Sequence, residues 1–173
     1  MQYMCQPLSR IQLREYARSI RKALKLDKCA WLPAVKLLEG FHRVLEDEDF
    51  NVEIVDDDYF TNGTHAAYFP EENCIRVRNS VYEGACNNCG RDRMTIVHEL
   101  AHVFLLRVSS VQFSRCFDEK TMPTYCDPEW QAKCLAGELM MPYYLVGTQT
   151  AAEIAENCGV SWQAAEFQKS KYK

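Results

Sequence analysis

Two histidines and a glutamate stand close together in the stretch HELAH, at His98, Glu99 and His102. On an α-helix, positions i and i+4 lie on the same face one turn apart, so both imidazoles point to the same side. Two imidazoles in that arrangement can bind one Zn²⁺, which takes histidine nitrogens at about 2.0–2.1 Å. A glutamate beside the first histidine lies next to the metal without binding it, and there it can act as a general base on the attacking water.

The residues around this motif predict that the helix carrying it, from about 91 to 107, is buried. Its apolar side chains surround the motif on nearly every face: Ile96, Val97, Leu100, Ala101, Val103, Phe104, Leu105 and Leu106. The alternative is a pair of core histidines hydrogen-bonded to backbone carbonyls. That alternative would bury the Glu99 carboxylate without a partner, at a large cost in free energy. We therefore predict a metal site.

A third metal ligand must come from another segment, because no histidine follows His102. A catalytic zinc generally has three protein ligands and one open position. The stretch from 127 to 141 begins with Asp-Pro, which is typical of a helix N-cap followed by the first helical residue. Glu129 shares a face of this helix with Ala132 and Ala136, two small residues that would let the helices approach. We predict Glu129 as the third ligand; the alternative is a first-turn acid that stabilises the helix dipole.

The remaining patterns predict an α+β fold in one domain spanning residues 1–173. Helical spacing and strand alternation identify the other elements. They are helices at 9–26 and from Pro33, a strand around 52–54, a β-hairpin at 65–79, a polar loop at 82–93 and a C-terminal helical pair at about 148–170. Residues 109–126 show no clear period, and a lid over the site is one interpretation of this segment.

The C-terminal pair also has the pattern of a helix-turn-helix, with a break at Gly159 and Ser161 as a cap. This pattern supports an alternative function, a DNA-binding regulator with a metal-stabilised core. Few basic side chains precede Lys169 in the would-be recognition helix, and the net charge of −4 opposes strong phosphate contacts. We therefore favour a helical hairpin that packs on the rest of the domain.

Charge and hydropathy restrict the location and the partners of the protein. A net charge of −4 and a pI of about 5.6 argue against bulk binding to nucleic acid or to an anionic membrane. The opening residues contain no apolar run, so no signal peptide is expected. No stretch approaches the roughly 20 apolar residues of a membrane span. We predict a cytoplasmic protein with no membrane partner.

The nine cysteines are odd in number and mostly irregular in spacing. In a cytoplasmic chain such residues are mainly free thiols or metal ligands. Cys86 and Cys89 form a CxxC pair that could bind a second zinc with Cys116 and Cys126, or form a redox pair. No second CxxC accompanies them, so we favour free thiols.

Two stretches, RDRMTIVHELAHVFLL and PEWQAKCLAGELMMP, together resemble the ImmA/IrrE family of bacterial and phage metallopeptidases. In that family, R-x-R-F-T-x-A-H-E-L-G-H is followed by E-x-E-A-N-x-F-A-A-x-L-L-M-P. The likeness covers about residues 65–168. It departs at Ala101, at Gln131 and at Lys133, which stand where the family pattern has glycine, glutamate and asparagine. None of these three is a proposed ligand.

The resemblance implies a small zincin-like, gluzincin-like metallopeptidase domain, with helices packed on a short antiparallel sheet or hairpin. It implies Zn²⁺ on His98, His102 and Glu129, with Glu99 as the catalytic base. It also implies a cytoplasmic peptidase that cleaves a helix-turn-helix repressor or an antitoxin-like partner. The alternative is a DNA-binding or partner-binding regulator whose zinc is structural or sensing, without hydrolysis. The candidates for a donor to the oxyanion are Tyr125, Tyr143, Tyr144 and His65.

Overall fold

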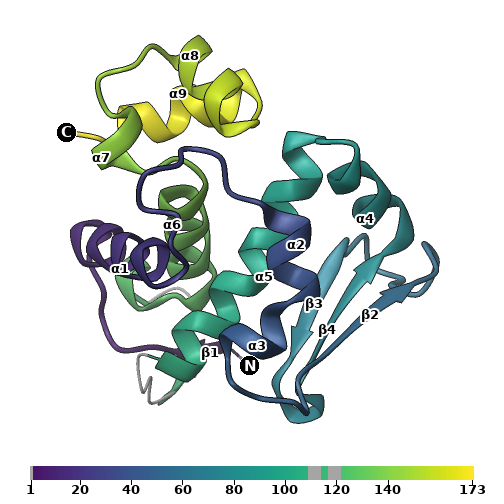
Figure 1. Cartoon of the computed structure of the whole chain (residues 1–173). Helices are drawn as coiled ribbons and strands as arrows, with labels where there is room; N and C mark the ends of the chain where they lie inside the picture. Colours follow the sequence, from purple (N-terminus) through teal and green to yellow (C-terminus); the bar gives the residue numbers. More distant parts are fainter. Residues whose placement is uncertain (1, 109–113, 117–121) are drawn as a thin grey trace.

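The computed structural model describes residues 2–108, 114–116 and 122–173 (Figure 1). The HELAH motif lies on α5 (Gly90–Val108), which runs through the centre of the molecule. Against one side of α5 packs α6 (Pro128–Met140), with α1 (Arg10–Ala23) beyond it. The sheet, α2 (Ala34–Glu39) and α4 (Asn79–Cys86) contact α5 elsewhere. The α+β prediction is confirmed.

The main sheet has three strands in the order β2-β4-β3. The predicted hairpin is confirmed: β3 (Ala66–Phe69) pairs antiparallel with β4 (Cys74–Arg78) across the 3₁₀ turn Pro70–Glu72. The predicted strand near 52–54 is β2 (Asn51–Val55), and it runs parallel to β4. The sheet is therefore mixed rather than purely antiparallel, because alternation identifies a strand but not the direction of its partner. Strand β3 lies at one edge of the sheet.

A smaller sheet joins the N-terminal residues to the segment before α6. Strand β1 (Gln2–Met4) pairs antiparallel with β5 (Ser114–Cys116). The Cys5 N–H then donates to the Cys126 carbonyl, which belongs to the 3₁₀ turn Thr124–Cys126. The lid predicted over residues 109–126 lies largely outside the described residues. No helix in the described ranges is both long and apolar enough to cross a membrane.

Helices α1 and α6 begin where capping residues predict them. Ser9 forms a capping box at the start of α1, and the Asp127 side chain accepts from the Glu129 N–H at the start of α6. The helix predicted from Pro33 is interrupted at Gly40 and continues as α3 (Phe41–Val44).

The loop predicted at 82–93 is wrong. This region contains the end of α4, a short connection and the start of α5. Helix α4 buries only Val81 and Ala85, one turn apart, and the rest of it is polar or small. So short an apolar pattern gives little signal of a helix.

The C-terminal part contains α7 (Tyr143–Val146), α8 (Ala151–Cys158) and α9 (Trp162–Ser170). The turn between α8 and α9 contains Gly159 at a φ of 64° and is fixed to the start of α5. The buried guanidinium of Arg93 donates to the carbonyls of Cys158, Gly159 and Leu32 and lies 3.7 Å over the Trp31 ring. The turn of the hairpin is therefore attached to the start of the helix that carries the motif.

Replacing Arg93 with methionine is expected to lower the free energy of unfolding by about 3 kcal/mol, because three carbonyl groups lose their donor at a site that is 1% exposed. Urea denaturation followed by circular dichroism measures this change. The matched control is Arg91→Met, the same substitution two residues earlier at an exposed position, which should cost less than about 0.5 kcal/mol. Equal effects of the two substitutions would contradict the structural role given to Arg93.

Candidate metal site

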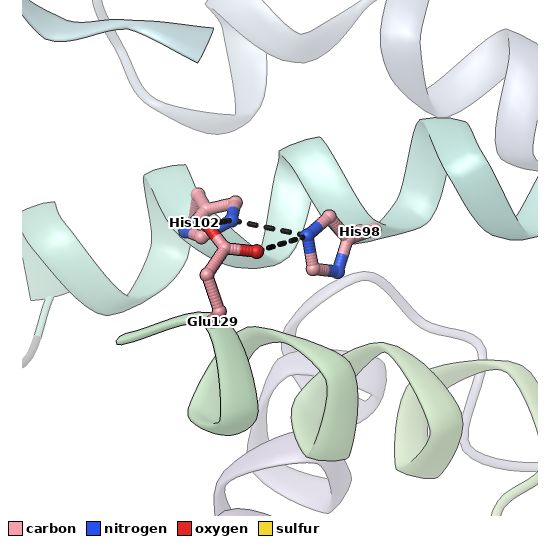
Figure 2. Close-up of side chains that lie close together, drawn as sticks. All are labelled: His98, His102 and Glu129. Atoms are coloured by element: carbon pink, nitrogen blue, oxygen red, sulfur yellow. Dashed lines mark hydrogen bonds and ion pairs between the residues drawn. The ribbon is translucent and has the colours of Figure 1, made fainter. Parts of the chain in front are cut away.

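Three side chains from α5 and α6 converge on one point (Figure 2). His98 and His102 project from neighbouring turns of α5, and Glu129 projects from the first turn of α6. The His98 Nε2 atom lies 3.2 Å from one Glu129 oxygen, and the His102 Nε2 atom lies 3.1 Å from the other. The two Nε2 atoms are 3.1 Å apart. The structure thus brings together the three residues that the sequence predicts as ligands.

These spacings fit a metal ion. Ligands at 2.0–2.1 Å from a tetrahedral zinc are separated by about 3.3 Å, close to the three separations observed. Two neutral imidazoles and a carboxylate are also a donor set that zinc commonly takes. Within the described residues this is the only cluster of three or more His, Cys, Asp or Glu side chains close enough to share an ion. That the cluster binds zinc stays a prediction.

Local sequence explains how Glu129 reaches the histidines. Ala132 and Ala136 are buried at 0% and 1% exposure, and α6 packs directly on α5. Asp127 fixes the first turn of α6 by accepting from the Glu129 N–H at 2.9 Å. Hydrogen bonds from His102 and His98 hold the pKa of the Glu129 carboxyl far below its usual range. Glu129 is therefore a carboxylate and available as a ligand.

Glu99 lies beside this cluster in a different environment. Its side chain is only 7% exposed, and one carboxyl oxygen accepts from the Tyr68 N–H of β3 at 2.9 Å. Burial raises the pKa of Glu99 from 4.5 to about 7, against the opposing influence of His98 and of the Tyr68 N–H. A carboxyl group with a pKa near 7 can accept and return a proton near neutral pH, as a general acid–base catalyst must.

This raised pKa predicts a pH-dependent stability of the metal-free protein. Between about pH 4.5 and 7 the folded protein keeps a proton on Glu99 that the unfolded chain loses, so the wild type is destabilised as pH rises through this window. The Glu99→Gln variant has no ionisable group at this position, so its stability does not change with pH for this reason. Relative to the wild type, the variant should gain about 3 kcal/mol in free energy of unfolding from pH 4 to pH 8. Urea denaturation of chelator-treated protein at both pH values tests this. A constant difference would contradict it.

A cavity of about 790 Å³ opens over the cluster, lined by residues of α5, β3 and the start of α6. Its lining includes Glu99, the three predicted ligands and residues of the edge strand. The lining residues are Thr64, Ala66, Ala67, Tyr68, Pro70, Glu71, His98, Glu99, His102, Leu106, Asp127, Pro128 and Glu129. The site is therefore open to a ligand along the edge of the sheet.

Of the four candidate oxyanion donors, two have clear partners away from the cluster. Tyr143 and Tyr144 lie on α7 under the guanidinium groups of Arg14 and Arg18, at 4.7 and 5.0 Å from the ring centroids. Neither lines the cavity. His65 precedes β3, between cavity-lining residues, and its Nε2 atom lies 2.9 Å from an Arg91 nitrogen. Because arginine only donates, His65 accepts at Nε2 and keeps a donor at Nδ1.

The CxxC pair does not complete a second cluster in the described part of the chain. Cys86 ends α4 and Cys89 precedes α5, and both are exposed free thiols. Cys126 is buried elsewhere, beside the Cys5 backbone, and no third ligand among the described side chains joins the pair. The Cys116 side chain lies outside this description. Cys86, Cys89 and Cys126 are not in disulfide bonds in the structure, and the expectation that they are free thiols rather than zinc ligands stays a prediction.

Two contacts near the site could not be predicted from the sequence. One is the hydrogen bond from the Tyr68 N–H to Glu99, which depends on the packing of β3 against α5. The other is the contact between Arg91 and His65, whose positions are 26 residues apart. The hairpin pattern places both Tyr68 and His65 near β3, but only the tertiary structure shows which groups they meet.

Comparison with known proteins agrees with the two motifs. A solved structure of a Mycobacterium tuberculosis transcriptional regulator is similar in fold, with a TM-score of 0.57 at 14% identity over 88% of this chain and 44% of that one. This chain thus spans less than half the length of that structure. No curated protein matches the chain. A family model for the IrrE N-terminal-like domain, Peptidase_M78, matches residues 45–168, which are well over half of the sequence and include both motifs. The chain therefore belongs to the IrrE N-terminal-like family of the Peptidase_M78 domain.

Proposed function

We propose that this protein is a zinc-dependent peptidase that cleaves a regulatory protein, a helix-turn-helix repressor or an antitoxin-like partner. The observation that carries the proposal is the convergence of His98, His102 and Glu129 beside the buried carboxyl of Glu99. The family is named for a peptidase domain, and peptidases of this class generally depend on a metal. A buried base, three ligands and an open cavity are the parts that metal-assisted hydrolysis requires.

Each residue has a distinct role in the proposed reaction. His98, His102 and Glu129 would hold the ion, and Zn²⁺, when bound, supplies a Lewis acid that polarises water and the scissile carbonyl. Glu99 accepts a proton from the attacking water and later gives it to the leaving amine. The Tyr68 N–H keeps the Glu99 carboxyl in place. The donor to the oxyanion stays open among Tyr125, Tyr143, Tyr144 and His65, none of which lines the cavity.

The edge strand β3 offers a surface for an extended peptide. The Arg78 N–H donates to the His65 carbonyl, so in this antiparallel pair the backbone groups of Ala67 and Phe69 face β4. Those of Ala66 and Tyr68 face the other way, as the bond from Tyr68 to Glu99 illustrates. A peptide that adds to a sheet edge gains backbone hydrogen bonds without a sequence requirement. We infer that the substrate lies along β3 with its scissile bond near the three ligands.

The kind of partner follows from the family resemblance. Members of the ImmA/IrrE family are expected to act on helix-turn-helix repressors, and the similar solved structure is described as a transcriptional regulator. Both point to gene regulation as the setting of the cleavage. This chain spans under half of that structure, so the similarity does not identify one particular partner. Regulators are therefore the class of partner to test first.

The alternative, a DNA-binding regulator without hydrolysis, depends on the hairpin of α8 and α9. The turn of this hairpin is pressed against α5: a Cβ atom added to Gly90 would lie 2.9 Å from the Val160 Cα atom. The first turn of α9 lines a cavity beside α5, through Ser161 and Ala164. These contacts favour a packing role for the hairpin over insertion into a DNA groove.

The test is incubation of the zinc-loaded protein with a panel of purified helix-turn-helix repressors and antitoxins, followed by mass spectrometry of the products. Cleavage at one bond that chelation abolishes and added zinc restores is the expected result. The same preparation is assayed for DNA binding at increasing salt. Salt-sensitive DNA binding near micromolar concentrations, with no cleavage of any panel protein, would favour the regulator instead.

A further inference from the structure

A second cavity, of about 410 Å³, lies at the other side of the predicted ligands. It is bounded by the start of α5, by Lys133 of α6 and by the start of α9. The lining residues are Gly90, Arg91, Met94, Thr95, His98, Lys133, Val160, Ser161 and Ala164. His98 lines both this cavity and the larger one along β3, so the two cavities adjoin at the metal site.

Helical spacing explains why the second cavity adjoins the ligands. Arg91, Thr95, His98 and His102 follow one another along a single face of α5. Lys133 lies one turn after Glu129 on the facing side of α6, at the same i and i+4 spacing. A peptide that crosses the metal site along this face therefore reaches Arg91 and Lys133 next.

The two cavities differ in charge. The cavity along β3 contains four acidic side chains, which are Glu71, Glu99, Asp127 and Glu129. The cavity at α9 is lined by no acidic residue and contains two cationic side chains. Among the described residues, no carboxylate forms an ion pair with Arg91 or Lys133, and both are exposed. Arg91 donates to His65, which leaves its charge uncompensated.

We propose that this cavity selects an acidic residue of the substrate, aspartate or glutamate, within two positions of the cleaved bond. This inference rests on the peptidase function proposed above. Met94, Val160 and Ala164 provide an apolar wall for the methylene groups of such a side chain. Arg91 and Lys133 provide donors for its carboxylate, and a charge-assisted hydrogen bond is stronger than a neutral one. Lys133 stands where the family pattern has asparagine, so the preference would be a property of this chain.

The experiment exposes zinc-loaded protein to a randomised synthetic peptide library and locates the cleaved bonds by mass spectrometry. Wild-type cleavage should be enriched for aspartate or glutamate at one position within two residues of the bond. A pair of peptides that differ by glutamate or glutamine at that position then gives a ratio of kcat/KM. Lys133→Met should lower this ratio about five-fold, and Lys133→Glu should reverse the preference. The zinc content of each variant is measured beside its kinetics.

The matched control is Lys36→Glu, which changes the net charge equally at an exposed site on α2 outside both cavities. It should leave the ratio unchanged. No acidic enrichment in the wild type, or an enrichment that survives Lys133→Glu, would overturn the inference while leaving the peptidase function intact.

A binding assay keeps the inference testable if no peptide is cleaved, a result that would count against the proposed function. Fluorescence anisotropy compares an acidic and a neutral labelled peptide on zinc-loaded Glu99→Gln protein. Tighter binding of the acidic peptide that Lys133→Glu removes would support the cavity assignment by itself. Equal binding of the two peptides would overturn it.

Discussion

Replacing Glu99 with glutamine should lower kcat for peptide hydrolysis by about 10³-fold, since general acid–base catalysis contributes on the order of 10²–10⁴. Glutamine has nearly the same shape and can still accept from the Tyr68 N–H, but it cannot take a proton from water. The three predicted ligands are untouched. Zinc content should therefore remain at the wild-type level while turnover is lost. Single-turnover cleavage assays and mass spectrometry of bound metal measure the two quantities on the same preparation.

The control for this prediction is Glu71→Gln, the same chemical change at an exposed carboxylate in the same cavity. It should alter kcat less than about three-fold, because an exposed side chain that touches no ligand contributes little. If Glu99→Gln retained more than a tenth of wild-type turnover with full zinc, another group would have to serve as the base, and the proposed mechanism would be wrong.

Replacing Glu129 with alanine should weaken zinc binding by about 10³-fold, a larger loss than the 10–100-fold typical of second-sphere changes. The carboxylate supplies an oxygen to each imidazole nitrogen at 3.1–3.2 Å, and no other described acid or thiol lies close enough to replace it. Competition against a chromophoric chelator gives the dissociation constant. One zinc per chain in the wild type and markedly less in the variant is the expected outcome.

Glu156→Ala serves as the matched control, since Glu156 is an exposed glutamate on α8 and lines neither cavity. Its zinc affinity should equal that of the wild type. Zinc that survives Glu129→Ala with unchanged affinity would move the third ligand to another residue or to the cysteines. In that case the short separations around Glu129 would reflect hydrogen bonds between Glu129 and the histidines rather than a metal site.

The two histidines of the candidate site could be predicted from sequence because their common face depends on helical spacing alone. His98 and His102 share a face whatever packs against it. Glu129 is predicted as the third ligand from two further local features, the N-cap at Asp127 and the small residues Ala132 and Ala136 along one face. Short-range geometry of this kind is fixed by the chain itself, and the structure reproduces it.

Other features depend on contacts between distant segments, which local patterns do not encode. The alternation of Val52 and Ile54 indicates a strand, but its parallel partner is set by the path of the whole chain. Arg93 would be assigned to the surface by residue type, since arginine is rarely buried, yet it is 1% exposed and bonded to three carbonyls. Its acceptors belong to segments that no sequence window links to it.

The contact between Arg93 and the α8–α9 turn affects when, during synthesis, the domain can finish folding. The Cys158 carbonyl that Arg93 binds lies 65 positions later in the chain, so it leaves the ribosome well after α5. Until then the guanidinium remains hydrated and lacks two of its three acceptors, and the first turns of the motif helix lack their anchor. The proposed peptidase would thus become competent only after most of the chain has emerged, which delays proteolysis until synthesis of this domain is nearly finished.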